Sequence, residues 1–256
     1  MTIIDHATVI DMLCNTKIIY NYNEDTRYKK IEYRTLHIED VLVNNKFTEK
    51  CKCLTICQKI QIITDEMTNV QVGITTDDSN KRICITFRGT KNTTSWYYNL
   101  QSNKQCVGNH ISLHKGFCKQ MFTTNLYYKI LNILHKQITE NPEYELFVTG
   151  HSAGGALATL FGYFLSNELT DKQIKIVSFA SPRIGNYKFK QDFESRINLI
   201  HYRVTNQQDI IPCIPFYKYH HVGHKISIQT HPKWFCCCCR EHLTESYYTS
   251  LIDTTW

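Results

Sequence analysis

The 256-residue chain is 42% hydrophobic, which is enough to build the core of one α/β domain, and its length does not require two. Its net charge of +6 comes from scattered lysines and arginines, so a nucleic-acid-binding tail is not expected. No window of about 18 apolar residues occurs, and Asp5 and Asp11 interrupt the apolar N-terminus. We therefore expect neither a transmembrane helix nor a secretory signal. We predict an intracellular, cytoplasmic protein, for which peripheral contact with a membrane stays open.

The twelve cysteines of a chain without a secretory signal are expected to be mostly thiols. Four lie in apolar patterns and are predicted to be core residues: Cys14, Cys84, Cys118 and Cys213. Two clusters stand apart, Cys51–Cys57 and the run Cys236–Cys239. Four adjacent cysteines cannot all ligate one zinc ion in a relaxed tetrahedral site, so no metal is predicted. The run is interpreted as free thiols, with S-acylation as the alternative.

The first part of the chain contains one helical pattern followed by strand patterns. Residues 4–20 carry apolar side chains at helical spacing. Strands are predicted over 31–36, 40–42, 54–63, 69–76 and 82–87. The domain organisation predicted from this is an N-terminal helix and irregular segment over residues 1–50, packed on a domain spanning 51–256.

Beyond residue 110 the patterns favour alternating helices and strands. One long helix is predicted over 117–139, ended by Asn141-Pro142. Further strands are predicted over 144–149, 173–179, 198–204 and 225–228, with helices over 153–167 and 187–196 and a final helix from about 242. This alternation predicts an α/β fold with a mostly parallel central sheet flanked by helices.

Residues Gly150–Gly154 match G-x-S-x-G, the nucleophile elbow, between a predicted strand and a predicted small-residue helix. A serine on such a turn has strained backbone angles, and side chains two residues away on either side would crowd it. The turn also directs the first backbone N–H groups of the helix toward the same point. Ser152 is therefore the predicted nucleophile.

A serine nucleophile needs a base, and the base needs an orienting acid. Asp209 follows the predicted strand 198–204, in a turn stiffened by Pro212, and is the predicted acid. The C-terminal region offers several histidines: His220, His221, His224, His231 and His242. His242 is the predicted base because it stands at the start of the final helix, which can anchor it. His221 is the alternative.

Two backbone donors are expected to stabilise the oxyanion. Ala153 directly follows the nucleophile and supplies one N–H. Thr90, at the end of Phe87-Arg88-Gly89, suits the second donor. No metal or organic cofactor is implied.

Several ordered blocks carry a family resemblance: Phe87–Thr90, His114–Phe117, Gly150–Ala158, Phe179–Asn186 and Val204–Pro212. With them the chain resembles the class 3 (fungal-type) lipase family. The resemblance implies an α/β-hydrolase that cleaves carboxyl esters of acylglycerols or phospholipids, with Ser152, Asp209 and His242 as the triad and Thr90 as the oxyanion threonine. It implies a lipid ester substrate at a membrane or lipid-droplet surface.

Residues 91–107 occupy the position of that family's lid helix. Trp96, Tyr97 and Leu100 would give this lid its apolar face, and a plain surface helix is the alternative. Phospholipase A1 and acyltransferase activity stay open because they use the same machinery. A non-catalytic lipid-binding protein with this fold is the alternative of another class, against which the complete Ser-Asp-His set argues.

Overall fold

The computed structural model describes residues 4–21, 33–37, 59–89, 104–229 and 242–253. The predicted strand at 40–42, the first part of that at 54–63, and the cysteine clusters 51–57 and 236–239 lie outside these residues. So do Thr90 and the predicted lid residues Trp96, Tyr97 and Leu100.

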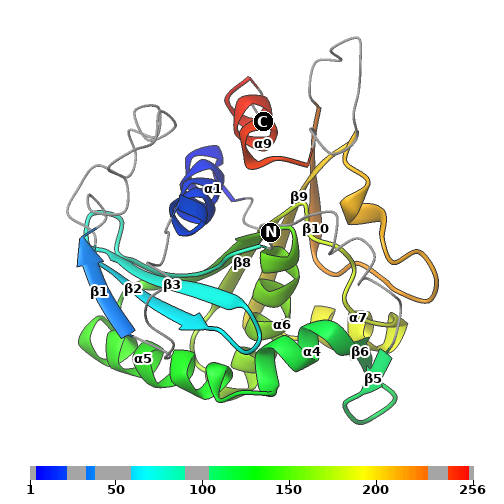
Figure 1. The fold of residues 1–256 in the computed structure, drawn as a ribbon, viewed down its shortest axis with the longest axis horizontal. Helices are drawn as coiled ribbons and strands as arrows, with labels where there is room; N and C mark the ends of the chain where they lie inside the picture. The colour runs from blue at the N-terminus through cyan, green and yellow to red at the C-terminus, as the bar shows by residue number, and fades with distance from the viewer. Residues whose placement is uncertain (1–3, 22–32, 38–58, 90–103, 230–241, 254–256) are drawn as a thin grey trace.

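An eight-stranded sheet forms the centre of the molecule (Figure 1), in the order β1-β2-β3-β4-β7-β8-β9-β10. Its strands are β1 (Tyr33–His37), β2 (Lys59–Asp65), β3 (Val70–Asp77), β4 (Arg82–Phe87), β7 (Glu145–His151), β8 (Ile174–Phe179), β9 (Leu199–Asn206) and β10 (His224–Ile228). Pairs from β1 to β4 are antiparallel, and pairs from β4 through β10 are parallel. The parallel part therefore brings the carboxyl ends of β7 and β9 to one sheet edge.

Helices cover both faces of the sheet (Figure 1). One face carries α1 (His6–Asn21) and α9 (Thr244–Ile252). The other face carries α4 (Lys115–Phe122), α5 (Leu126–Glu140), α6 (Ala153–Glu168) and α7 (Tyr187–Glu194). A small hairpin of β5 (Lys104–Cys106) and β6 (Ser112–His114) lies beside α4. In the described part of the chain, no helix combines the length and apolar character needed to cross a membrane.

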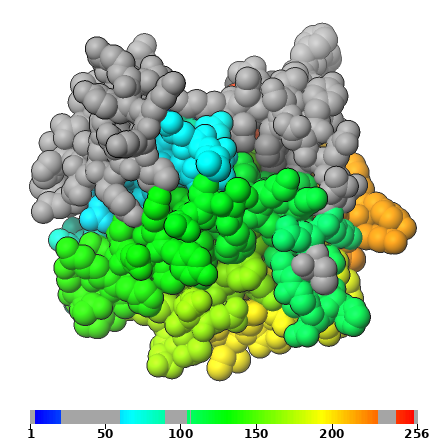
Figure 2. Space-filling model, turned by 60° about the horizontal axis from the view of Figure 1, so that its bottom comes forward, coloured from blue at the N-terminus to red at the C-terminus, as the bar shows by residue number. Residues whose placement is uncertain are grey.

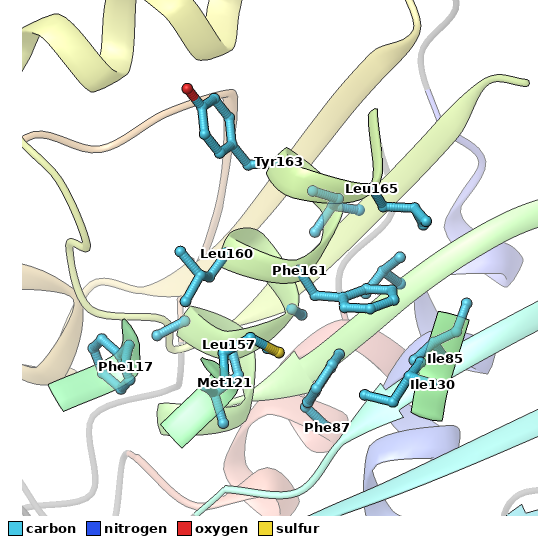
Figure 3. Close-up of a cluster of buried hydrophobic side chains, with 14 of the residues drawn as sticks. Ile85, Phe87, Phe117, Met121, Ile130, Leu157, Leu160, Phe161, Tyr163 and Leu165 are labelled. Carbon is cyan, nitrogen blue, oxygen red and sulfur yellow. The ribbon is translucent and has the colours of Figure 1, made fainter. Parts of the chain in front are cut away.

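The larger core fills the layer between the sheet and α4, α5 and α6 (Figure 3). Phe161 of α6 lies at its centre, with ring centroids 5.5 Å from Phe87 and 5.5 Å from Tyr127. The small residues of α6 let this helix lie close to the strands: a Cβ on Gly162 would come within 2.5 Å of Ile176 Cδ1. The apolar helix after the elbow is thus held tightly against the sheet, and it fixes the position of the elbow.

A second core, on the opposite face, holds the two terminal helices. Leu13 and Ile19 of α1 and Leu251 of α9 are fully buried there, together with Val177 of β8. The N-terminal helix thereby becomes part of the same hydrophobic unit as the C-terminal helix, although they are far apart in sequence.

Two sequence predictions are wrong in the described region. The single helix expected over 117–139 is two helices, α4 and α5, separated by residues 123–125. Thr124 at this break donates a hydrogen bond to the Asp65 carboxylate and accepts one from the Leu126 N–H at 3.3 Å. This contact with the end of β2 replaces the helical continuation. Cys213, expected in the core, is exposed because it lies in a surface turn after β9.

Candidate active site

The elbow places Ser152 between β7 and α6 with φ 59° and ψ −126°, a left-handed conformation that is costly for any residue with a side chain. Both motif glycines are required sterically. A Cβ on Gly150 would lie 2.3 Å from the Gly154 carbonyl oxygen, and a Cβ on Gly154 would lie 2.2 Å from the Phe87 carbonyl oxygen. The sharp turn is therefore built from backbone packed directly on backbone, as the motif predicts.

Three polar side chains meet at this turn. His242 Nε2 lies 2.8 Å from Ser152 Oγ, and His242 Nδ1 lies 2.8 Å from Asp209 Oδ2. Since a carboxylate only accepts hydrogen bonds, Nδ1 carries the imidazole proton and Nε2 is left to accept the serine proton. All three residues are buried, each 3% exposed. The structure thus brings together the three predicted residues in the geometry that base-assisted attack requires.

Tyr247 also takes part in this site, although sequence reasoning did not assign it a role. Its hydroxyl donates to Asp209 Oδ2 at 2.8 Å and accepts a hydrogen bond from the Asn206 N–H at 3.0 Å. The other carboxylate oxygen, Oδ1, accepts from the Ile211 N–H at 2.9 Å. Asp209 therefore accepts hydrogen bonds from Tyr247, Ile211 and His242, which fix the position of its carboxylate. The only sequence signal for Tyr247 is its place on α9, shortly after His242.

Ala153 is the first residue of α6, so its backbone N–H has no acceptor within the helix. Its predicted oxyanion role fits this position. The second predicted donor, Thr90, lies outside the described residues, but Gly89 just before it is described. Gly154 packs on the carbonyl of Phe87, so the end of β4 lies directly against the elbow.

His221, the alternative base, is engaged elsewhere. Its Nε2 lies 2.6 Å from the carbonyl oxygen of Pro212, so this nitrogen donates to the turn that follows Asp209. Burial and the neighbouring Arg203 lower the pKa of His221 to about 3. Through this contact His221 supports the turn that follows Asp209, and it does not contact Ser152.

The buried histidines predict a loss of stability in acid. Burial lowers the pKa of His151, His201 and His221, so all three are neutral in the folded protein. In the unfolded chain each gains a proton below about pH 6.5. Their contribution is therefore complete above that pH and is lost as the pH falls, by about 1.4 kcal/mol per pH unit for each histidine.

Urea unfolding at about pH 7.5 and about pH 5.5 measures this slope. His221→Asn is expected to reduce it, and His135→Asn, at an exposed position on α5, serves as the matched control. Equal slopes in the wild type and in His221→Asn would contradict the prediction.

A central sheet with the nucleophile elbow at the end of β7, the acid after β9 and the histidine before α9 defines the α/β-hydrolase fold. Residues 84–219 match the family model described as lipase (class 3). The chain belongs to the class 3 lipase family, as its sequence blocks predict.

Curated relatives agree with this assignment. A lipase of Rhizopus niveus is 29% identical over 210 residues, which cover 75% of this chain and 50% of the relative. The secreted mono- and diacylglycerol lipase 1 of Fusarium solani is 30% identical over 150 residues, covering 58% of this chain and 44% of the relative. The chain thus spans about half the length of these relatives.

Among solved structures, the mono- and diacylglycerol lipase of Aspergillus oryzae has a TM-score of 0.73 at 19% identity, covering 91% of this chain and 83% of the other. The lipase of Rhizopus microsporus var. chinensis has a TM-score of 0.68 at 22% identity, covering 88% and 74%. These likenesses establish the fold.

Proposed function

We propose that the protein is a serine carboxyl-ester hydrolase acting on lipid esters. The observation that carries the proposal is the continuous chain of hydrogen bonds from Asp209 through His242 to Ser152 Oγ, at the elbow. Membership of the class 3 lipase family and the lipase names of the Rhizopus and Fusarium relatives support lipid esters as the substrate class.

The geometry leads to a two-stage reaction. His242 Nε2 takes the Ser152 proton as Oγ attacks the ester carbonyl carbon, and the Ala153 N–H and Thr90 stabilise the oxyanion. Collapse of the tetrahedral intermediate breaks the ester bond, and the alcohol leaves with the proton from His242. Water then gives its proton to His242 and attacks the acyl carbon. The second tetrahedral intermediate collapses and releases the fatty acid, and His242 returns the proton to Ser152 Oγ.

A conformational step is part of the proposal because Ser152 is only 3% exposed. Substrate reaches this hydroxyl only when the groups that cover it move aside. Of the predicted lid segment 91–107, residues 104–106 form strand β5 and not a helix, so we propose the part before it, with Trp96, Tyr97 and Leu100, as the lid that makes this movement. An intracellular location also stays a prediction.

We also propose contact with a lipid surface, through an aromatic tip formed by Phe216, Tyr217 and Lys218. Phe216 is 67% exposed and Tyr217 is 74% exposed. This region projects from the molecule beside the β5–β6 hairpin (Figure 2), where Lys104 Nζ donates to the Lys218 carbonyl at 2.5 Å. Arg183 Nη1 holds the base of the tip through the Pro215 carbonyl at 3.0 Å. Two exposed rings beside two lysines suit an anionic lipid surface.

Replacing both Phe216 and Tyr217 with serine is expected to weaken binding to phosphatidylserine-containing vesicles severalfold, because both rings lose their insertion into the interface. Hydrolysis of a soluble short-chain ester should be unchanged. Vesicle co-sedimentation measures the binding, and turnover of the soluble ester measures the activity. Ile197→Ser is the matched control: this residue is 96% exposed but precedes β9, at the sheet edge opposite Ser152. Equal losses in both variants would argue against the tip.

The proposed function is tested by treating the purified protein with a fluorophosphonate probe and then assaying short-chain esters, long-chain esters and phosphatidylcholine. We expect labelling of the native protein and hydrolysis of acylglycerol esters. Preference for phosphatidylcholine would indicate a phospholipase A1, and acyl transfer to an added alcohol would indicate an acyltransferase. Absence of labelling would favour the non-catalytic lipid-binding alternative.

A further inference from the structure

His151, between Gly150 and Ser152 in the elbow, makes contacts that the reaction above does not use. Its side chain is buried, 4% exposed. Its Nε2 lies 2.7 Å from the backbone carbonyl oxygen of His242. Its Nδ1 lies 3.3 Å from the hydroxyl oxygen of Tyr20, near the end of α1. The residue beside the nucleophile thus connects the N-terminal helix to the backbone of the base.

These two contacts select one tautomer of His151. A carbonyl oxygen only accepts, so Nε2 must carry the proton and donate to His242. Nδ1 is then unprotonated and accepts the hydroxyl proton of Tyr20. Tyr20 therefore stabilises the tautomer that can hold the His242 backbone.

His151 is also uncharged, as the position beside the base requires. Burial and the adjacent His242 lower the pKa of His151 well below its usual range. The rings of His151 and His242 have centroids 4.8 Å apart. Because His242 becomes positively charged during the reaction, a neutral neighbour avoids a repulsion that a protonated His151 would cause.

Tyr20 also lies against the segment that precedes Thr90. A Cβ on Gly89 would lie 1.9 Å from the Tyr20 hydroxyl oxygen and 2.6 Å from the His151 carbonyl oxygen. The Tyr20 hydroxyl, the end of β4 and the elbow therefore meet at one point, and only a glycine fits between them. The same tyrosine thus contacts the loop of the predicted oxyanion threonine and the residue next to the nucleophile.

We propose that Tyr20 and His151 form a positioning pair, in which His151 fixes the main chain of His242 and Tyr20 fixes the tautomer of His151. The proposal rests on the proposed function, because it assigns His242 as the base. Asp209 and Ser152 hold the imidazole ring, whereas His151 holds the backbone that carries it. Through Tyr20, the N-terminal helix α1 therefore helps to position the base.

A set of variants separates the two contacts. His151→Leu removes both and is expected to lower kcat by about ten- to a hundredfold with little change in KM, since small displacements of a catalytic group have effects of this size. His151→Gln places an amide N–H close to the Nε2 position and should recover most of kcat. The side chain of His151→Asn offers an oxygen near the Nδ1 position but does not reach the His242 carbonyl. This variant should therefore not recover kcat. Tyr20→Phe should lower kcat severalfold, but not further in the His151→Gln background.

His201→Leu is the matched control for loss of a buried neutral histidine. His201 is 2% exposed and its Nε2 lies 2.8 Å from Ser178 Oγ, on the same sheet. This variant should lower the melting temperature without the fall in kcat. If His151→Gln is no more active than His151→Asn at equal folded fraction, or if His151→Leu keeps wild-type kcat, the positioning role is refuted.

A measurement independent of activity distinguishes this proposal from the proposed function. Imidazole ¹H–¹⁵N spectra should show His151 neutral and protonated at Nε2 from about pH 5 to about pH 8. The signal of the His242 Nδ1 proton should be seen in the wild type and should be weaker in His151→Leu. A His151 that titrates in this range, or that is protonated at Nδ1, overturns the pair even in an active enzyme. If the spectra agree but Ser152 is not labelled, the proposed function fails and the positioning geometry stands.

Discussion

Ser152→Ala is expected to abolish fluorophosphonate labelling and to lower kcat for ester hydrolysis by about a millionfold, the loss typical when a triad nucleophile is removed. The hydroxyl that His242 Nε2 faces at 2.8 Å is then missing, while the surrounding hydrogen bonds of His242 to Asp209 and His151 stay. The measurement is turnover of a soluble ester beside probe labelling, with circular dichroism to verify folding. Equal labelling of wild type and Ser152→Ala would refute the assignment of the nucleophile.

The same position allows a test of backbone strain. Both Ser152→Ala and Ser152→Gly remove the hydroxyl, so the comparison between them isolates the left-handed conformation at φ 59°. Glycine relieves this strain, and Ser152→Gly should be more stable than Ser152→Ala by about 1 kcal/mol in urea unfolding. In an unstrained backbone the order is reversed, so a less stable glycine variant would contradict the strained elbow.

Asp209→Asn is expected to lower kcat by about ten thousandfold while the protein stays folded, as in other triads where the acid becomes an amide. The amide no longer stabilises the positive charge that His242 gains, and it can turn its NH₂ group toward Nδ1, which favours the wrong tautomer. The hydrogen bond from the Ile211 N–H to the oxygen at the Oδ1 position keeps the side chain at position 209 in place. Steady-state kinetics and urea unfolding measure the two effects separately.

His242→Ala should lower kcat at least as much as Asp209→Asn does, because it removes the base itself. Retained activity in His242→Ala together with its loss in His221→Ala would transfer the role of base to His221. The contact of His221 Nε2 with the Pro212 carbonyl predicts that this will not occur.

Much of the fold was predictable because its signals are local. The glycines at 150 and 154 flank a serine between a strand and a helix, and only backbone fits within the contact distances of that turn. The strand at 82–87 was predicted with its observed bounds, since it is a short, strand-like run that follows a turn and is buried in the sheet interior. The family inferred from the sequence blocks is confirmed by the match over residues 84–219.

Other features depended on contacts between distant segments. The break between α4 and α5 is made by Thr124 reaching Asp65, a partner far away in sequence, and helical periodicity continues straight through it. The exposure of Cys213 depends on how the turn after β9 is folded, because an apolar neighbourhood in sequence does not establish burial.

The sequence by itself determined the family, the elbow and the small set of candidate acids and histidines, because these follow from residue type and short spacing. Only the tertiary structure decided which histidine meets Ser152, since His221 and His242 are the same residue type and differ in where the folded chain places them. It also gave His151 its contacts with Tyr20 and with the His242 backbone. No spacing rule predicts these contacts, because they join α1, β7 and the residue before α9 only after the sheet and its two terminal helices have packed.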